Sequence, residues 1–208
     1  IDNYLEVLNV LDQNPSLGKY AEYSGSVLNN IALIHLRQGE YDLALPYLKK
    51  SLRFNQNDPN TLTSIGNIYA YKKQTDSSLY SYQKGITEAE KRNDHSNLAN
   101  LYSNTARVLL EKTGSDAKAQ DYIQKSLRLV DKHKLGILKR SVFINAAMVY
   151  LKNSDLENAK KYAFEAKSLK TVNTLNDLYT DSGLWNALYQ IYTETKEYDK
   201  ALDAYIQH

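Results

Sequence analysis

Residues 28–52 read LNNIALIHLRQGEYDLALPYLKKSL and decide the fold. Apolar residues recur three and four positions apart on both sides of the turn-forming stretch Gln38-Gly39-Glu40, which is the spacing of amphipathic helices. Because the connection between the two helices is short, they must run antiparallel. We therefore expect residues 28–52 to form a helical hairpin.

The same pattern returns along the chain. Each unit has a large apolar residue followed four positions later by a small one, and then a second small residue. The second small residues are 34, 41, 40 and 42 positions apart. The first pairs are Leu28/Ala32, Leu62/Gly66, Tyr102/Ala106, Phe143/Ala147 and the imperfect Trp185/Tyr189; the second column holds Ala44, Ser78, Ala119, Ala159 and Ala201.

Small side chains at both columns let the two helices of a unit cross closely. One helix pair cannot bury its apolar faces alone, so successive pairs must stack. The Asp58-Pro59 step marks a helix start, with Asp58 as the N-cap and Pro59 in the first turn. The periodicity predicts helices at 2–12, 19–37, 41–54, 60–72, 77–92, 97–112, 117–132, 137–152, 156–170, 175–194 and 198–207.

These residues resemble the tetratricopeptide repeat, in which large apolar residues, a Gly, a Tyr and an Ala recur at fixed spacings. Leu62-x2-Ile65-Gly66-x2-Tyr69 carries the motif, and the copy that begins at Trp185 departs from it at Tyr189. The resemblance implies an all-α fold, a right-handed α-solenoid of antiparallel helix pairs. The later units resemble the long repeat form of bacterial tetratricopeptide regulators. We expect the end of a truncated preceding repeat and a linker helix at 1–24, then about five repeats at 25–58, 59–98, 99–139, 140–181 and a truncated 182–208.

Composition excludes several classes of protein. Lys and Arg number 26 and Asp and Glu 24, and a net charge of +2 is too small to drive binding to nucleic acid or to an anionic membrane. Cysteine is absent, which removes disulfides and thiolate metal sites. No apolar run approaches the roughly 18 residues of a membrane span, so we expect no membrane insertion of this segment. We expect it to be a piece of a longer polypeptide, in a compartment left open, with the cytoplasm favoured over the periplasm.

No group of residues has the pattern of a catalytic, cofactor or metal site. His35, His95, His133 and His208 lack ligand spacing, and His35 falls at a packing column of the repeat. The glycines are too dispersed for a phosphate loop. Many of the 18 tyrosines fall at packing columns, as Tyr69 does, and not on a stacking platform for nucleic acid. We expect no enzyme activity, no cofactor and no metal.

The first helix of each repeat lines the concave face of such a solenoid, which generally binds extended partners. In three of the five units, an Asn stands two positions after the large apolar residue. The Asn amide has a donor and an acceptor, so it can pair with both polar groups of one peptide residue. A column of this kind resembles that of tetratricopeptide proteins that hold peptide main chain. We expect the groove to contain Asn30, Ser64, Asn67, Asn104, Arg107, Asn145 and Met148, with Leu33 and Gln190 as counterparts, Arg37 and Lys152 at its flanks, and a gap at Ala187.

The main functional interpretation is a non-enzymatic scaffold that binds a protein or peptide ligand. Because the Asn column has no evident structural duty, Asn145→Ala is expected to weaken binding and leave folding nearly intact. An alternative is the sensory region of a bacterial transcription regulator or sensor kinase whose effector domain lies outside this segment. A third is an array that only forms a homodimer of its parent protein.

Overall fold

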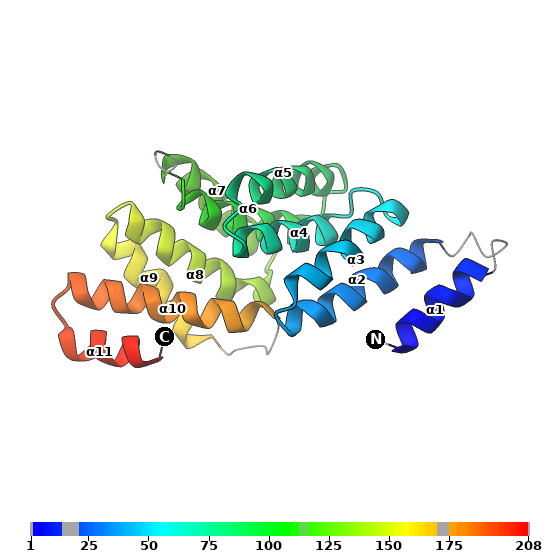
Figure 1. Cartoon of the computed structure of the whole chain (residues 1–208). Helices are drawn as coiled ribbons and strands as arrows, with labels where there is room; N and C mark the ends of the chain where they lie inside the picture. Colours follow the sequence, from blue (N-terminus) through cyan, green and yellow to red (C-terminus); the bar gives the residue numbers. More distant parts are fainter. Residues whose placement is uncertain (1, 14–20, 113, 115, 170–174, 208) are drawn as a thin grey trace. The chain divides into compact units, whose positions relative to one another are not determined.

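The computed structural model describes residues 2–13, 21–112, 114, 116–169 and 175–207. Those residues contain eleven α-helices and no strand, which confirms the all-α class (Figure 1). Among these helices, none combines the length and the apolar character that crossing a membrane requires. The helices are α1 (Asp2–Gln13), α2 (Ala21–Arg37), α3 (Tyr41–Phe54), α4 (Pro59–Tyr71), α5 (Thr75–Lys91), α6 (His95–Leu109), α7 (Asp116–Lys132), α8 (Gly136–Lys152), α9 (Leu156–Ser168), α10 (Leu175–Glu194) and α11 (Tyr198–Gln207).

Aspartate side chains fix three of the helix starts. Each accepts a hydrogen bond from a backbone N–H of the first turn, which would otherwise lack a partner. The prediction placed the start of α6 at residue 97, whereas α6 begins at His95 because the preceding Asp94 is its cap. The backbone N–H of Thr61 donates to Asp58 (2.8 Å), that of Asn97 to Asp94 (3.0 Å) and that of Asn158 to Asp155 (3.1 Å).

The chain divides into two compact units, residues 1–88 and 89–208. In the first unit α1 packs against α2, α2 against α3, and α3 against α4. In the second unit α6 pairs with α7, α8 with α9, and α10 with α11. Because α8 also packs against both α6 and α10, these three first helices lie side by side in one layer (Figure 1).

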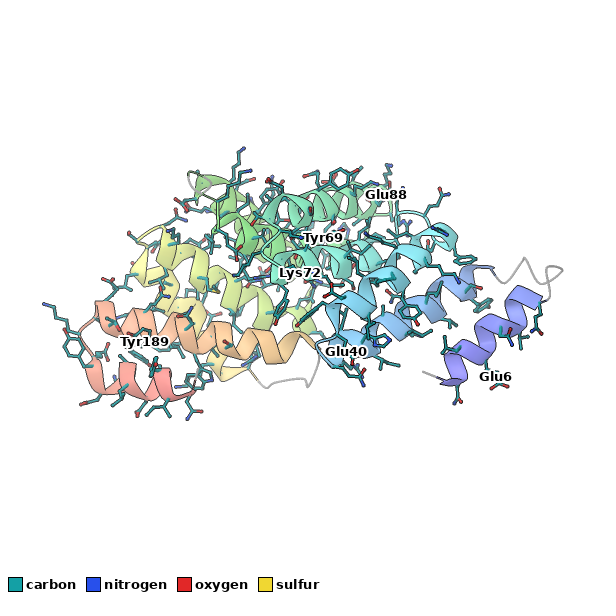
Figure 2. All side chains as sticks on the ribbon, viewed as in Figure 1. Glu6, Glu40, Tyr69, Lys72, Glu88 and Tyr189 are labelled. Atoms are coloured by element: carbon teal, nitrogen blue, oxygen red, sulfur yellow. The ribbon has the colours of Figure 1, made fainter. Side chains whose placement is uncertain are left out.

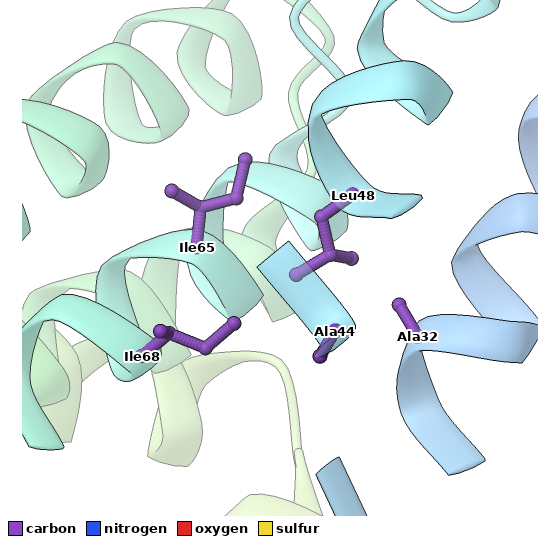
Figure 3. Packing of buried hydrophobic residues seen from close by; sticks show 5 residues of the cluster. All are labelled: Ala32, Ala44, Leu48, Ile65 and Ile68. Carbon is purple, nitrogen blue, oxygen red and sulfur yellow. The ribbon is translucent and has the colours of Figure 1, made fainter. Parts of the chain in front are cut away.

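The core of the first unit shows how successive helix pairs stack. Ala32 of α2, Ala44 and Leu48 of α3, and Ile65 and Ile68 of α4 form one buried cluster (Figure 3). Ala32 and Ala44 belong to the two small-residue columns of the sequence. One helix pair and the first helix of the next pair therefore share a single core, as the repeat requires.

The small residue of each first helix is matched by a residue of the second helix. At Gly66 the match is close, because an added Cβ would overlap the ring of Tyr82, which is fully buried. The Tyr82 hydroxyl donates to Oδ1 of Asn67 at 2.6 Å. The equivalent pairs Ala32/Leu48, Ala106/Ile123 and Ala147/Ala163 are fully buried.

The last repeat departs from this matching. Tyr189 stands where the first helix of the other repeats has a small residue, and Tyr205 stands at the position of Leu48 and Tyr82 in the second helix. Two large rings do not fit in the space of a small and a large residue. Their ring centroids lie 5.7 Å apart, and both side chains remain exposed. The imperfect copy in the sequence therefore becomes an exposed pair of aromatic rings on α10 and α11.

Candidate functional site

The second unit contains a cavity of about 530 Å³ at the ends of α8 and α10. Its volume lies within the range of small-ligand pockets, about 300–1,000 Å³. Tyr189, labelled on α10 in Figure 2, forms part of its wall. The lining residues are Leu110 after α6, Met148, Leu151 and Lys152 of α8, Ser154 and Leu156, and Asn186, Ala187, Tyr189, Gln190, Thr193 and Glu194 of α10.

The cavity combines apolar walls with side-chain amides and two charges. Nε2 of Gln190 donates to Oδ1 of Asn186 at 3.0 Å. That bond leaves the NH₂ group of Asn186 and the side-chain oxygen of Gln190 for a ligand, and a peptide residue offers the complementary acceptor and donor. Lys152 and Glu194 add one positive and one negative charge to the wall. The arrangement suits a peptide segment that inserts one apolar side chain.

The structure brings together three of the residues that the sequence placed at or beside the groove. Met148, Gln190 and Lys152 all line the cavity. Asn104 and Arg107 are half-buried on α6 and are not among the lining residues. Nδ2 of Asn104 donates a hydrogen bond to Oδ1 of Asn100, one turn earlier on α6, at 3.3 Å. The cavity therefore lies towards the C-terminal part of the expected surface.

Asn145 has an intramolecular partner that the sequence did not reveal. Its side chain is buried, and Nδ2 donates to Oγ of Ser103 on α6 at 2.8 Å. The expectation that Asn145 has no structural duty is therefore wrong, because its amide joins α8 to α6. Its contribution to peptide binding stays a prediction.

The remaining predicted residues belong to the first unit. Asn30 is exposed on α2. On α4, the hydroxyl of Ser64 donates to the backbone oxygen of Asn60 at 3.1 Å, a common local bond of helical serine. The amide oxygen of Asn67 accepts the bond from the buried Tyr82. Asn67 therefore supports the packing of α5 against α4.

Sequence reasoning missed most of the α10 side of the cavity. Asn186, Tyr189, Thr193 and Glu194 all lie there, one turn apart or adjacent. One signal was present, because Tyr189 occupies a column that is small in the other repeats. A large residue at a close helix crossing predicts a local rearrangement of the packing.

Three of the four histidines form structural contacts, and His208 lies outside the described residues. His35 stacks on Tyr47, with ring centroids 5.6 Å apart, and its Nδ1 lies 2.7 Å from a carboxylate oxygen of Glu40. In the second unit the rings of His95 and His133 stack with centroids 3.8 Å apart. No group of three or more His, Asp or Glu residues is placed to hold a metal ion within the described part of the chain.

The His95–His133 stack predicts a dependence of stability on pH. Burial, with smaller effects from His95 and Lys132, lowers the pKa of His133 below its usual 6.5. The folded chain therefore protonates His133 less readily than the unfolded chain does. The contribution of neutral His133 to the free energy of unfolding is fully present above pH 6.5 and is lost as the pH falls below that value. Urea unfolding between pH 5 and pH 8 measures this, with His133→Phe as the variant that keeps a ring and cannot titrate. An equally steep decline in that variant would contradict the assignment to His133.

A family model of the tetratricopeptide repeat matches residues 26–58. The photosystem I assembly protein Ycf3 of Rippkaea orientalis is 35% identical over 72 residues, and that of a Synechococcus species is 33% identical over 73 residues. Each alignment covers 35% of this chain, and they cover 38% and 42% of those proteins respectively. The chain thus spans about two fifths of the length of the curated relatives it matches.

Solved structures resemble the chain over most of its length. BtubC (BKLC) of P. vanneervenii has a TM-score of 0.68 at 15% identity, and the match covers 97% of this chain and 83% of the BtubC chain. PilF of Pseudomonas aeruginosa has a TM-score of 0.62 at 17% identity, covering 99% and 89%. MamA of Desulfovibrio magneticus RS-1 has a TM-score of 0.55 at 17% identity, covering 88% and 92%. At these identities the likeness concerns the fold.

These comparisons give no support to the alternative of a regulator's sensory region. They agree instead with the sequence columns and with the helix pairs that bury them. Residues 26–58 therefore match the tetratricopeptide repeat, and the chain is similar in fold to these solved structures over most of its length.

Proposed function

We propose that the chain is a non-enzymatic interaction scaffold that holds an extended peptide segment of a partner protein at the ends of α8 and α10. The observation that carries this proposal is the cavity, with apolar walls and the amide pair of Asn186 and Gln190. In repeat proteins of this kind, stacked helices create extended binding surfaces. An apolar side chain of the partner enters the cavity, and its main chain pairs with the amides.

An assembly role fits this chemistry. The two curated relatives are named as assembly proteins of photosystem I. Pairing to the main chain is indifferent to the partner's sequence, and one cavity adds only a limited preference. A surface of this kind can hold different subunits for a short time. We propose that this chain supports the assembly of a protein complex in that way.

Further contacts on the first helices remain part of the proposal. The proposed peptide contacts in the first unit are Asn30, Ser64 and Asn67. Those on α6 of the second unit are Asn104 and Arg107. The exposed Asn30 is the residue among them that a ligand can reach with least disturbance of the fold. Asn145 can take part only through the groups that its bond to Ser103 leaves over.

Gln190→Ala is the variant that tests the proposed site. We expect peptide binding to weaken by about 0.5–1.5 kcal/mol, because one main-chain hydrogen bond is lost. Peptides are first selected from a random library on the parent chain, and their affinities are then measured by titration calorimetry. Gln124→Ala makes the same chemical change at an exposed position of α7 and serves as the control. Equal affinity of the Gln190→Ala variant and the parent for every selected peptide would remove the site from α10.

Asn30→Ala tests the part of the proposal that concerns the first unit. A peptide that the first unit holds through Asn30 should lose about 0.5–1.5 kcal/mol of affinity, with an unchanged unfolding midpoint because Asn30 is exposed. A peptide bound as well by this variant as by the parent has no contact with Asn30. The same calorimetric titration gives the answer, and urea unfolding supplies the midpoint.

A further inference from the structure

Two opposite charges line the cavity at the ends of α8 and α10. Lys152 is exposed in the last turn of α8, and Glu194 is the exposed last residue of α10. Each stands five positions after the first-helix column of its repeat, which holds Ala147 in α8 and Tyr189 in α10. The two charges therefore occupy equivalent positions on helices that pack side by side (Figure 1).

These two charges are not used within the fold. In the part of the chain that the structure describes, neither Lys152 nor Glu194 forms an ion pair, with the other or with a third residue. The axes of packed helices lie about 8–10 Å apart, which exceeds the length of an ion pair between equivalent positions. Glu111, at the equivalent position after α6, does not line the cavity. One positive and one negative side chain are thus available to a ligand there.

Glu194 stands against the electrostatic preference of its own helix. The C-terminal end of a helix carries a partial negative charge, which favours a basic side chain and disfavours a carboxylate. Lys152 follows this preference at the end of α8, whereas the last turn of α10 has no basic residue. Helix stability therefore does not account for Glu194, and a cationic group of a ligand beside it would offset the unfavourable charge.

We propose that the cavity recognises its peptide by a pair of charges, with an acidic residue at Lys152 and a basic residue at Glu194. This inference rests on the proposed function and adds the charge pattern and the direction of the bound chain. An extended chain of the polyproline II type rises about 3.1 Å per residue with three residues per turn, so residues three positions apart lie on one side, about 9 Å apart. That distance matches the separation of two packed helices. The partner segment therefore has an acidic and a basic residue three positions apart, in an order that fixes its direction.

Exchanging the two charges tests this inference. The double variant Lys152→Glu, Glu194→Lys keeps the net charge and any attraction between the two positions, so its unfolding midpoint in urea should stay close to that of the parent. The matched control is Lys118→Glu, Glu165→Lys. It makes the same exchange at exposed positions of α7 and α9 that do not line the cavity.

The probes are two pools of phage-displayed peptides in which Asp and Lys are fixed three positions apart and the other positions are random. Asp precedes Lys in one pool and follows it in the other. After selection from an equal mixture, sequencing should show that the parent enriches one pool at least about threefold. The exchange variant should enrich the opposite pool, and the control variant the same pool as the parent. About 0.5 M salt should reduce these preferences, because exposed charges are screened.

Failure of this inference and failure of the proposed function give different results. Equal enrichment of both pools, by peptides whose affinity still falls with Gln190→Ala, would overturn the charge pair and leave the peptide site. The same preferred pool for the parent and the exchange variant would also overturn the charge pair. No enrichment of any peptide on the parent chain would overturn both.

Discussion

Gly66→Ala is expected to lower the free energy of unfolding by about 1–3 kcal/mol, although it adds only one methyl group. An added Cβ would lie 2.5 Å from Cδ1 of Tyr82 and closer still to Cε1. The Tyr82 ring cannot easily move aside, because its side chain is fully buried and its hydroxyl is bonded to Asn67. The two backbones must separate at their crossing, and contacts around them are lost.

Urea unfolding of the full chain measures this effect. Gly136→Ala is the control, since its added Cβ would meet nothing within 4 Å apart from its chain neighbours and the backbone of its own helix. It should change the unfolding free energy by less than about 0.5 kcal/mol. Adding Tyr82→Leu to Gly66→Ala recreates the Ala32/Leu48 pair of the first repeat and should recover part of the loss. An unchanged midpoint for Gly66→Ala alone would show that α4 and α5 do not cross at this residue.

Periodic residues made the fold predictable. The small columns at Ala32 and Ala44, and their recurrence, follow from close helix crossings that any stacked pair needs. Because the period is long and repeated, an error in one unit is corrected by the others. The Asp58-Pro59 step also located the start of α4, since capping is a local interaction within one helical turn.

The candidate site could be predicted only in part, because its residues are set by contacts between repeats. Met148 and Gln190 were predicted, because each follows from the helical spacing within its own helix. The stack of His95 on His133 joins residues far apart in sequence and depends on how two turns meet. Tyr189 marked a departure from the repeat, but where the ring would go depended on Tyr205. Function at such departures is expected, because the regular positions are already committed to packing.

Asn145→Ala is expected to lower the free energy of unfolding by about 1–3 kcal/mol, because it leaves the Ser103 hydroxyl, buried between α6 and α8, without its donor. Asn104→Ala is the matched control. Asn104 is half-buried and donates within its own helix, so its removal should cost less than about 0.5 kcal/mol.

A double-mutant cycle with Ser103→Ala isolates the bond. If the amide and the hydroxyl act as a pair, the double variant should lose less stability than the two single variants added together. The difference should be about 0.5 kcal/mol or more. Costs that simply add would place the effect of Asn145→Ala in packing around the side chain. No cost for Asn145→Ala would restore Asn145 to the set of groove residues without a structural duty. The assignment of this Asn thus depends on folding, measured separately from binding, since the same amide cannot be wholly committed to Ser103 and wholly free for a peptide.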